Sequence, residues 1–116
     1  MQDVINLFNK FDRYKGKQIN NYLEPSIKLN QYKKFYDNNE LVGFVNWAYI
    51  HDIVEKRFKQ TGKIKSNEWN SGNNLWLIEI VSIKNTFKMM RWVYHYFRKQ
   101  LKVNHLLLFH YLNILR

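Results

Sequence analysis

The chain has 116 residues, of which 46% are hydrophobic and 17% aromatic, so we expect one folded domain over residues 1–116 and exclude an intrinsically disordered chain. It contains no cysteine, which excludes disulfides and thiolate metal sites and favours a reducing compartment. The net charge is +10, and every charged residue after Glu79 is basic, so we expect an acidic partner.

The chain also lacks the patterns of exported and membrane-spanning proteins. Its first ten residues, MQDVINLFNK, contain no basic stretch followed by an apolar one, as a signal peptide does. No segment has the unbroken apolar length that a membrane span requires. We therefore predict a cytoplasmic protein without a membrane span.

The first 49 residues predict a helix followed by a hairpin. Apolar residues recur at helical spacing over 3–11, which predicts a short amphipathic helix. The polar stretch 12–28 contains Gly16 and Pro25 and is typical of an irregular connection. Residues 31–36 and 41–49 favour strands, and the sequence DNNE between them suits a tight turn.

The rest of the chain predicts alternating helices and strands. We expect a helix over 50–60 that stops before Gly62 and a helix over 84–102. Between them, residues 75–81 are apolar on both faces, which is typical of a strand in the middle of a sheet. The segment 104–115 is a last strand or a buried helix. This order predicts a mixed α/β domain.

The predicted helix 84–102 carries a row of basic side chains along one side. Their separations of three and four residues place them on one helix face. Lys99 lies beside this row and is counted with it. The residues of this basic stripe are Lys84, Lys88, Arg91, His95, Arg98, Lys99 and Lys102. The residues expected to be buried on the other side are Phe87, Met90, Tyr94, Phe97 and Leu101.

Three interpretations of the basic stripe remain open. A solvated helix face is the simplest, although such faces usually mix both signs of charge. A docking surface for an acidic protein would explain why like charges, which repel along a helix, lie together. Nucleic-acid binding would also use the cations, but it needs exposed aromatic side chains among them, and we expect most of those in the core.

Three segments resemble the toxin-activating lysine acyltransferases, the family of the hemolysin activator that acylates RTX toxins. The segment NQYKKFYDNNELVGFVNWAYI resembles the family's Asn-Gln-Tyr, Asp-Asn and Ser-Trp-Ala pattern. The segment MMRWVYHYFRKQL resembles its Tyr-Met-Arg-Lys-Lys-Phe helix end. The segment EWNSGNNLWLIEIVS matches the family pattern at Trp69, Ser71, Gly72, Trp76, Ile78 and Glu79. The resemblance spans roughly positions 25 to 110, with several rare residue types in order.

The resemblance implies a fold and a reaction. The fold would be similar to that of GNAT acetyltransferases, with residues 75–81 as a central strand. Family members move a fatty acyl group from acyl carrier protein to lysines of a protoxin, with a His and an Asp, and bind no acetyl-CoA. Glu79 stands at the position of the Asp. Ser71, Asn73, Asn74 and Trp76 would contact the substrate, and the basic stripe would dock the acidic acyl carrier protein.

The chain departs from the family at the His position. Counting back from Asn30 places it at Phe11, and no histidine precedes His51. The chain is also short relative to the family. The rival interpretation is therefore an inert binding or inhibitory protein, encoded by a phage or other mobile element, that uses its basic face to engage an acidic partner or a nucleic acid. We expect no bound cofactor and no metal, since no histidine pair has the spacing of a helical metal site. A homodimer through the LLLF segment is also expected.

Overall fold

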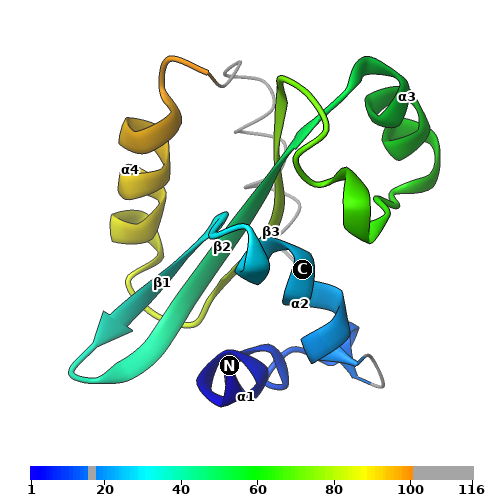
Figure 1. Cartoon of the computed structure of the whole chain (residues 1–116). Helices are drawn as coiled ribbons and strands as arrows, with labels where there is room; N and C mark the ends of the chain where they lie inside the picture. The colour runs from blue at the N-terminus through cyan, green and yellow to red at the C-terminus, as the bar shows by residue number, and fades with distance from the viewer. Residues whose placement is uncertain (16–17, 101–116) are drawn as a thin grey trace.

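A three-stranded antiparallel sheet forms the middle of the molecule, in the order β1-β2-β3 (Figure 1). The structure is a computed structural model, and it describes residues 1–15 and 18–100. Strand β1 is Tyr32–Asp37, β2 is Glu40–Ile50 and β3 is Asn74–Ser82. Strand β2 pairs with both of its neighbours and is the longest of the three, so it is the scaffold to which the other elements are attached.

The hairpin of β1 and β2 confirms the predicted strands and turn. The turn residues are Asn38 and Asn39, with φ of 48° and 69°. Positive φ at both central residues is the geometry of a two-residue hairpin turn whose twist matches that of the strands, and asparagine tolerates it better than most residues do. The two asparagines therefore fix the register of β1 on β2.

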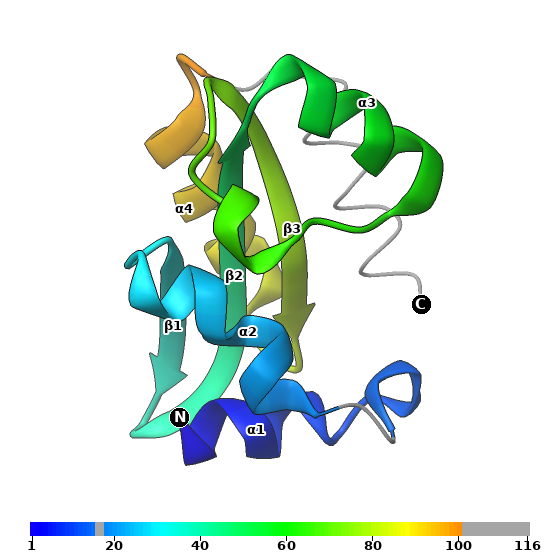
Figure 2. The same cartoon turned by 45° about the vertical axis from the view of Figure 1, so that its right-hand side comes forward.

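Helices lie on both faces of the sheet, which confirms the mixed α/β prediction (Figure 2). Helices α1 (Gln2–Phe8) and α2 (Ile19–Lys28) and the short 3-10 helix η1 (Asp12–Tyr14) cover one face, and α4 (Thr86–Phe97) covers the other. Helix α3 (Asp52–Thr61) follows β2, and a second 3-10 turn, η2 (Ser66–Glu68), precedes β3. In the described part of the chain, no helix is long and apolar enough to cross a membrane.

Two hydrophobic clusters attach these layers to opposite faces of the sheet. On the first face, side chains of α1 and α2 pack on Phe44 and Val81, and on the second, side chains of α4 pack on Val45, Trp47 and the start of β3. Phe44, Val45 and Val81 are almost completely buried. Because neighbouring residues of a strand point to opposite faces, β2 is apolar on both sides along much of its length.

The prediction that residues 12–28 form an irregular connection is wrong, because this stretch contains η1 and α2. Proline at position 25 was interpreted as a break, but it lies inside α2. The helix survives because its buried side, formed by Ile19, Leu23 and Ser26, packs against the rest of the fold. Packing of one face outweighs the local cost of a proline in a short helix.

Two other predictions for the second half of the chain have different outcomes. Helix α3 ends at Gly62, whose φ of 71° is left-handed, so the predicted glycine stop is confirmed. Strand β3 is confirmed, but within the described residues it pairs with β2 alone and lies at the edge of the sheet. The predicted last strand or helix over 104–115 lies outside the described residues.

The buried side of α4 differs from the predicted one. Its buried residues are Met89, Val93 and Phe97, whereas Phe87 is 77% exposed and Tyr94 is 50% exposed. Of the five residues predicted to be buried, only Phe97 is fully so, and Leu101 lies outside the described residues. The helix is rotated relative to the prediction: Met89, Val93 and Phe97 pack in one cluster with Val45 and Leu77, while Phe87 and Tyr94 face solvent.

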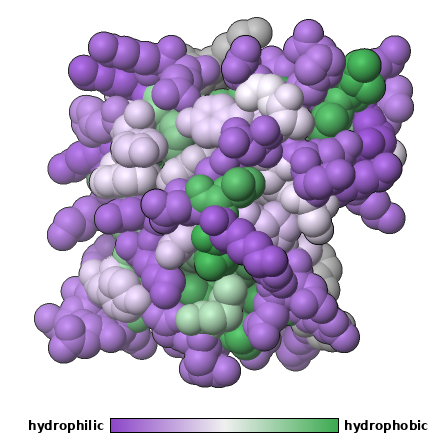
Figure 3. All heavy atoms as spheres, in the orientation of Figure 1, coloured by the Kyte–Doolittle hydropathy of each residue, from purple (hydrophilic) through white to green (hydrophobic). Residues whose placement is uncertain are grey.

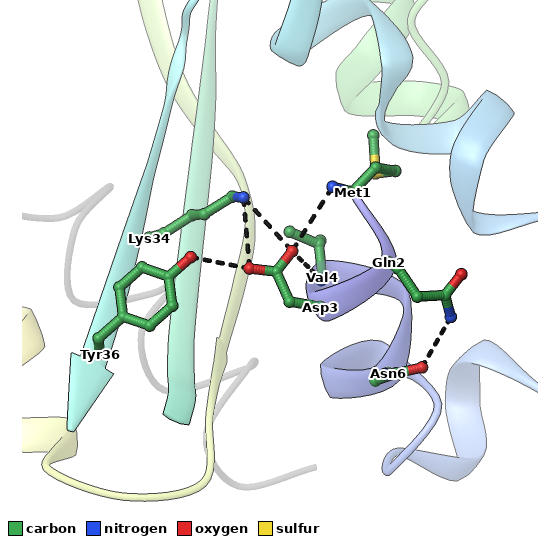
Figure 4. A network of polar contacts seen from close by, with 7 residues as sticks. All are labelled: Met1, Gln2, Asp3, Val4, Asn6, Lys34 and Tyr36. Carbon is green, nitrogen blue, oxygen red and sulfur yellow. Dashed lines mark hydrogen bonds and ion pairs between the residues drawn. The ribbon is translucent and has the colours of Figure 1, made fainter. Parts of the chain in front are cut away.

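A polar network joins the start of α1 to β1 (Figure 4). The Tyr36 hydroxyl donates to Asp3 Oδ2 at 2.7 Å, and Lys34 Nζ lies 3.3 Å from Asp3 Oδ1. The hydrogen bond from Tyr36, together with Lys34 and the Val4 N–H, lowers the pKa of Asp3 to about 2. The ionised carboxylate thus holds the N-terminal helix on the edge strand.

We expect Asp3→Asn to lower the free energy of unfolding near neutral pH by only about 0.5 kcal/mol, because the side chain is 39% exposed. Since the folded pKa lies below the ordinary value of 3.8, the wild-type contribution is present above that value and is lost as the pH falls through about 2. Urea unfolding across this pH range should show the two proteins converging. Asp12→Asn, at a 92% exposed carboxylate beside Lys15, is the control, and a pH-independent difference for Asp3→Asn would contradict the assignment.

Candidate functional site

Glu79 lies at a β-bulge in β3. Asn46 pairs with Glu79 but the next residue, Trp47, pairs with Leu77, so Ile78 is an extra residue on β3. Side chains alternate between the faces of a strand, and without the extra residue Glu79 would point to the same face as Leu77, toward α4. The bulge turns Glu79 to the opposite face, beneath η1 and α2.

Two tyrosine hydroxyls hold the Glu79 carboxylate. Tyr14, in η1, donates a short hydrogen bond to Oε2, and Tyr22, in α2, donates one to Oε1. Burial, followed by the charge of Glu79 and these hydrogen bonds, raises the pKa of both hydroxyls well above the ordinary value, while Arg13 acts in the opposite direction. Both hydroxyls therefore keep their protons at neutral pH.

The backbone of Glu79 is held by a buried amide. Asn46 Oδ1 accepts a hydrogen bond from the Glu79 N–H at 2.8 Å, and Asn46 Nδ2 donates to Ser26 Oγ at 3.0 Å. Ser26 in turn donates to the carbonyl of Leu23 at 2.9 Å. Asn46 and Ser26 are completely buried. This chain joins β3, β2 and α2, so the carboxylate is fixed both at its tip and at its backbone.

A cavity of about 280 Å³ lies between α2, α3 and the start of η2. Its wall includes Tyr22, which donates to Glu79, and Ile78, which precedes Glu79 in the chain, whereas Glu79 itself is not a wall residue. Its other apolar wall residues are Pro25, Phe58, Ile64 and Trp69. A larger cavity of about 740 Å³ shares Asn21, Pro25, Ser66 and Trp69 with it. The smaller one is the better candidate for chemistry, because it alone of the two reaches Tyr22.

On the face seen in Figure 1, hydrophobic residues are visible in the middle of a largely hydrophilic surface (Figure 3). Apolar surface surrounded by polar residues is typical of a site that receives a ligand with an apolar part. The wall of the smaller cavity combines apolar residues with Tyr22, whose hydroxyl donates to the Glu79 carboxylate. The chemistry available here is proton transfer beside an apolar cavity.

The structure places the four predicted substrate-binding residues at the junction of β2 and α3, apart from Glu79. Ser71 Oγ accepts from the His51 N–H at 3.1 Å, and Asn74 Nδ2 donates to Asp52 Oδ1 at 2.7 Å. Trp76 Nε1 donates to Glu55, and Asn73 is exposed. None of the four is among the wall residues of the two cavities. Their contact with a substrate stays a prediction.

The residues of the basic stripe are exposed on the α4 side of the sheet, opposite Glu79. The predicted helix over 84–102 is wrong at its start and, within the described residues, ends earlier, because α4 runs from Thr86 to Phe97 and Lys84, Arg98 and Lys99 flank it. Lys84 pairs with Asp37 at 2.6 Å, and Arg91 lies 5.3 Å above the ring of the exposed Phe87. Lys102 lies outside the described residues. The exposed members within the described residues are Lys84, Lys88, Arg91, His95, Arg98 and Lys99. We expected most aromatic rings of this helix in the core. Instead, this face exposes aromatic rings as well as cations.

The described histidines do not belong to the Glu79 site. His51 precedes α3 and its Nδ1 accepts from the Ile53 N–H at 3.2 Å, while His95 is exposed on α4. His105 and His110 lie outside the described residues. Tyr14 and Tyr22 were missed because they lie in the stretch predicted to be irregular. Helical spacing of Ile19 and Leu23 was the signal that could have placed Tyr22 on a helix.

Comparison with known proteins agrees with the resemblance. The model of the RTX toxin acyltransferase family, HlyC, matches residues 4–108. The chain is 37% identical over 75 residues to an uncharacterized protein, sll0720, of Synechocystis sp. (strain ATCC 27184 / PCC 6803 / Kazusa), covering 62% of this chain and 51% of that protein. It is 30% identical over 59 residues to the leukotoxin-activating lysine-acyltransferase LktC serotype T3 of Mannheimia haemolytica, covering 50% of this chain and 35% of that protein.

The chain thus spans about half the length of the first of these curated relatives and about a third of the second. The family model, by contrast, covers nearly all of this chain, including β1 to β3, Glu79 and the tyrosines that contact it. The chain belongs to the RTX toxin acyltransferase family.

Proposed function

We propose that the protein transfers an acyl group from an acyl carrier protein to a lysine side chain of another protein. The observation that carries this proposal is the carboxylate of Glu79, a residue that is 7% exposed, because it is held by two hydroxyls and one of these belongs to Tyr22 in the wall of a mostly apolar cavity. Family membership supports the reaction class, and LktC, one of its relatives, is a lysine acyltransferase by name.

Acyl transfer to lysine needs a group that accepts a proton. A lysine amine attacks only when it is neutral, and the nitrogen must lose a further proton as the new amide bond forms. In this proposal Glu79 is the final proton acceptor. The lysine enters from the side of Tyr22, because that residue belongs both to the cavity wall and to the hydrogen bonds of the carboxylate.

The acyl chain would lie against the apolar wall of the smaller cavity. Phe58, Ile64 and Ile78 supply hydrocarbon surface from three different parts of the chain, and Trp69 adds a buried aromatic ring. Burying an alkyl chain there is favourable by about 0.8 kcal/mol per methylene group. The cavity continues toward the larger one, which shares Trp69 with it and leaves room for the rest of the donor.

An acyl carrier protein is acidic, and the exposed basic stripe of α4 would attract it. Within the described residues, α4 carries no acidic side chain. Because α4 and Glu79 lie on opposite faces of the sheet, the part of the acyl carrier protein that bears the acyl group would have to pass around the sheet to reach the cavity. Long-range attraction needs no direct route, since it raises the rate of encounter and orients the partner.

The test is to incubate the protein with acyl-loaded acyl carrier protein and a lysine-rich peptide, and to follow both by intact mass. We expect the donor to lose its acyl group and the peptide to gain it. Glu79→Gln should slow this transfer by about 100-fold or more, because it removes the proton acceptor. Glu40→Gln, at an exposed carboxylate on β2, is the matched control and should transfer at the wild-type rate.

Two outcomes would count against the proposal. If Glu79→Gln transfers as fast as wild type, Glu79 is a structural group. If the wild-type protein leaves the donor loaded, the chain is better described as a binding protein that uses the basic surface of α4. Raising the salt concentration should also slow transfer, because screening weakens the attraction of the carrier, and a salt-independent rate would remove the docking role of the stripe.

A further inference from the structure

The two tyrosines bonded to Glu79 differ in the exposure of their side chains. Both tyrosines donate to the same carboxylate, one to each oxygen. Tyr14 is 3% exposed and packs edge-on against Phe8 inside the core, whereas Tyr22 is 39% exposed and belongs to the wall of the smaller cavity. A molecule in the cavity therefore meets the Tyr22 side of the carboxylate and not the Tyr14 side.

We propose that Tyr22 relays the proton between the substrate amine and Glu79, while Tyr14 only positions the carboxylate. This inference rests on the acyl transfer proposed above and adds the residue that touches the substrate. Its basis is the unequal position of the two tyrosines that donate to Glu79: the Tyr14 side chain is buried in the core, whereas the Tyr22 side chain is part of a cavity wall.

The proposed relay couples formation of the amide bond to two proton transfers. The lysine nitrogen forms a bond to the thioester carbonyl carbon, and a proton leaves the nitrogen for the Tyr22 oxygen as the Tyr22 proton moves to Glu79 Oε1. The carbon–sulfur bond then breaks, and the proton returns from Glu79 through Tyr22 to the departing thiolate. The products are an amide and a thiol, with both side chains restored and no change in oxidation state.

Two features of the site suit this role. Tyr22 keeps its proton at neutral pH, so it can donate to Glu79 and accept from the amine in one concerted step, without passing through a free phenolate. The acceptor is held rigidly, because Asn46 binds the backbone of Glu79 and Tyr14 binds its second oxygen. Within the described residues, neither His51 nor His95 makes a hydrogen bond to this carboxylate.

The experiment compares Tyr22→Phe with Tyr14→Phe, since each removes one hydroxyl from the same carboxylate. With acyl-loaded acyl carrier protein as donor and a lysine-rich peptide as acceptor, Tyr22→Phe should lower kcat by about 100-fold. Tyr14→Phe should lower it by less than about tenfold, because the relay stays intact. The solvent deuterium isotope effect on kcat should fall in Tyr22→Phe and stay unchanged in Tyr14→Phe.

A purely structural role for the hydroxyls predicts a different pattern. Both variants would then lose activity in proportion to their loss of thermal stability, and neither would change the isotope effect. That pattern, or a Tyr22→Phe protein with wild-type kcat, would overturn the relay and leave the proposed acyl transfer intact. A wild-type protein that transfers no acyl group would overturn both proposals.

Discussion

Replacing Asn46 with alanine should lower the free energy of unfolding by about 3 kcal/mol. The side chain is completely buried, and it satisfies the Glu79 N–H that the β-bulge removes from regular pairing with β2. Alanine would leave that N–H without its acceptor, remove the donor to Ser26 Oγ and open a small cavity. Urea unfolding of the two proteins measures the difference directly.

The control for Asn46→Ala is Asn73→Ala, the same substitution at an exposed residue that directly precedes β3. It should change stability by less than about 0.5 kcal/mol. Transfer activity adds a second measurement, because a carboxylate whose backbone has moved no longer meets both tyrosines. If Asn46→Ala is as stable as Asn73→Ala, the bulge does not depend on this amide, and our account of how Glu79 is positioned is wrong.

Local signals in the sequence were enough to predict the hairpin and α3. Asn38 and Asn39 favour a tight turn, and Gly62 favours the end of a helix. Each of these residues adopts the positive φ that its position requires. These features do not depend on the rest of the fold, so they can be read from a short segment. The mixed α/β class followed from the order of the segments.

Features that depend on contacts between distant segments could not be predicted in the same way. The proline in α2 indicated a break, and only the packing of Ile19 and Leu23 on the sheet explains why the helix continues. The tyrosines that contact Glu79 lie 65 and 57 residues before it in sequence. No local pattern connects residues at such separations, so this part of the site was found only in the structure.

The bulge explains why the position of Glu79 was hard to predict. A regular alternation would place Glu79 with Leu75 and Leu77, on the α4 side, where the basic stripe also lies. A single extra residue, Ile78, moves the carboxylate to the other face. The resemblance identified Glu79 as the residue of interest, but only the strand register shows that it and the basic stripe face in opposite directions.

Among the glycines that the structure describes, Gly72 is the one where an added methyl group has the least room. A Cβ there would lie 2.6 Å from both N and Cα of His51 and 2.8 Å from the carbonyl carbon of Ile50. All three are backbone atoms, so no side chain can turn aside. The Ser71 and Gly72 N–H groups both donate to the carbonyl of Tyr49, at 2.8 and 3.2 Å, which holds the segment close to the end of β2.

We therefore expect Gly72→Ala to destabilise the protein by about 3 kcal/mol, at the upper end for overpacking, because relief of the clash separates the segment from Tyr49. Gly62→Ala is the control: its φ of 71° is unfavourable for alanine, but its Cβ would meet open space, so we expect a loss of about 1 kcal/mol. Thermal unfolding of both variants decides the order. Equal losses of stability in the two variants would mean that the β2–α3 junction can open at little cost. Ser71 and Gly72, which match the family pattern, would then not hold this junction closed.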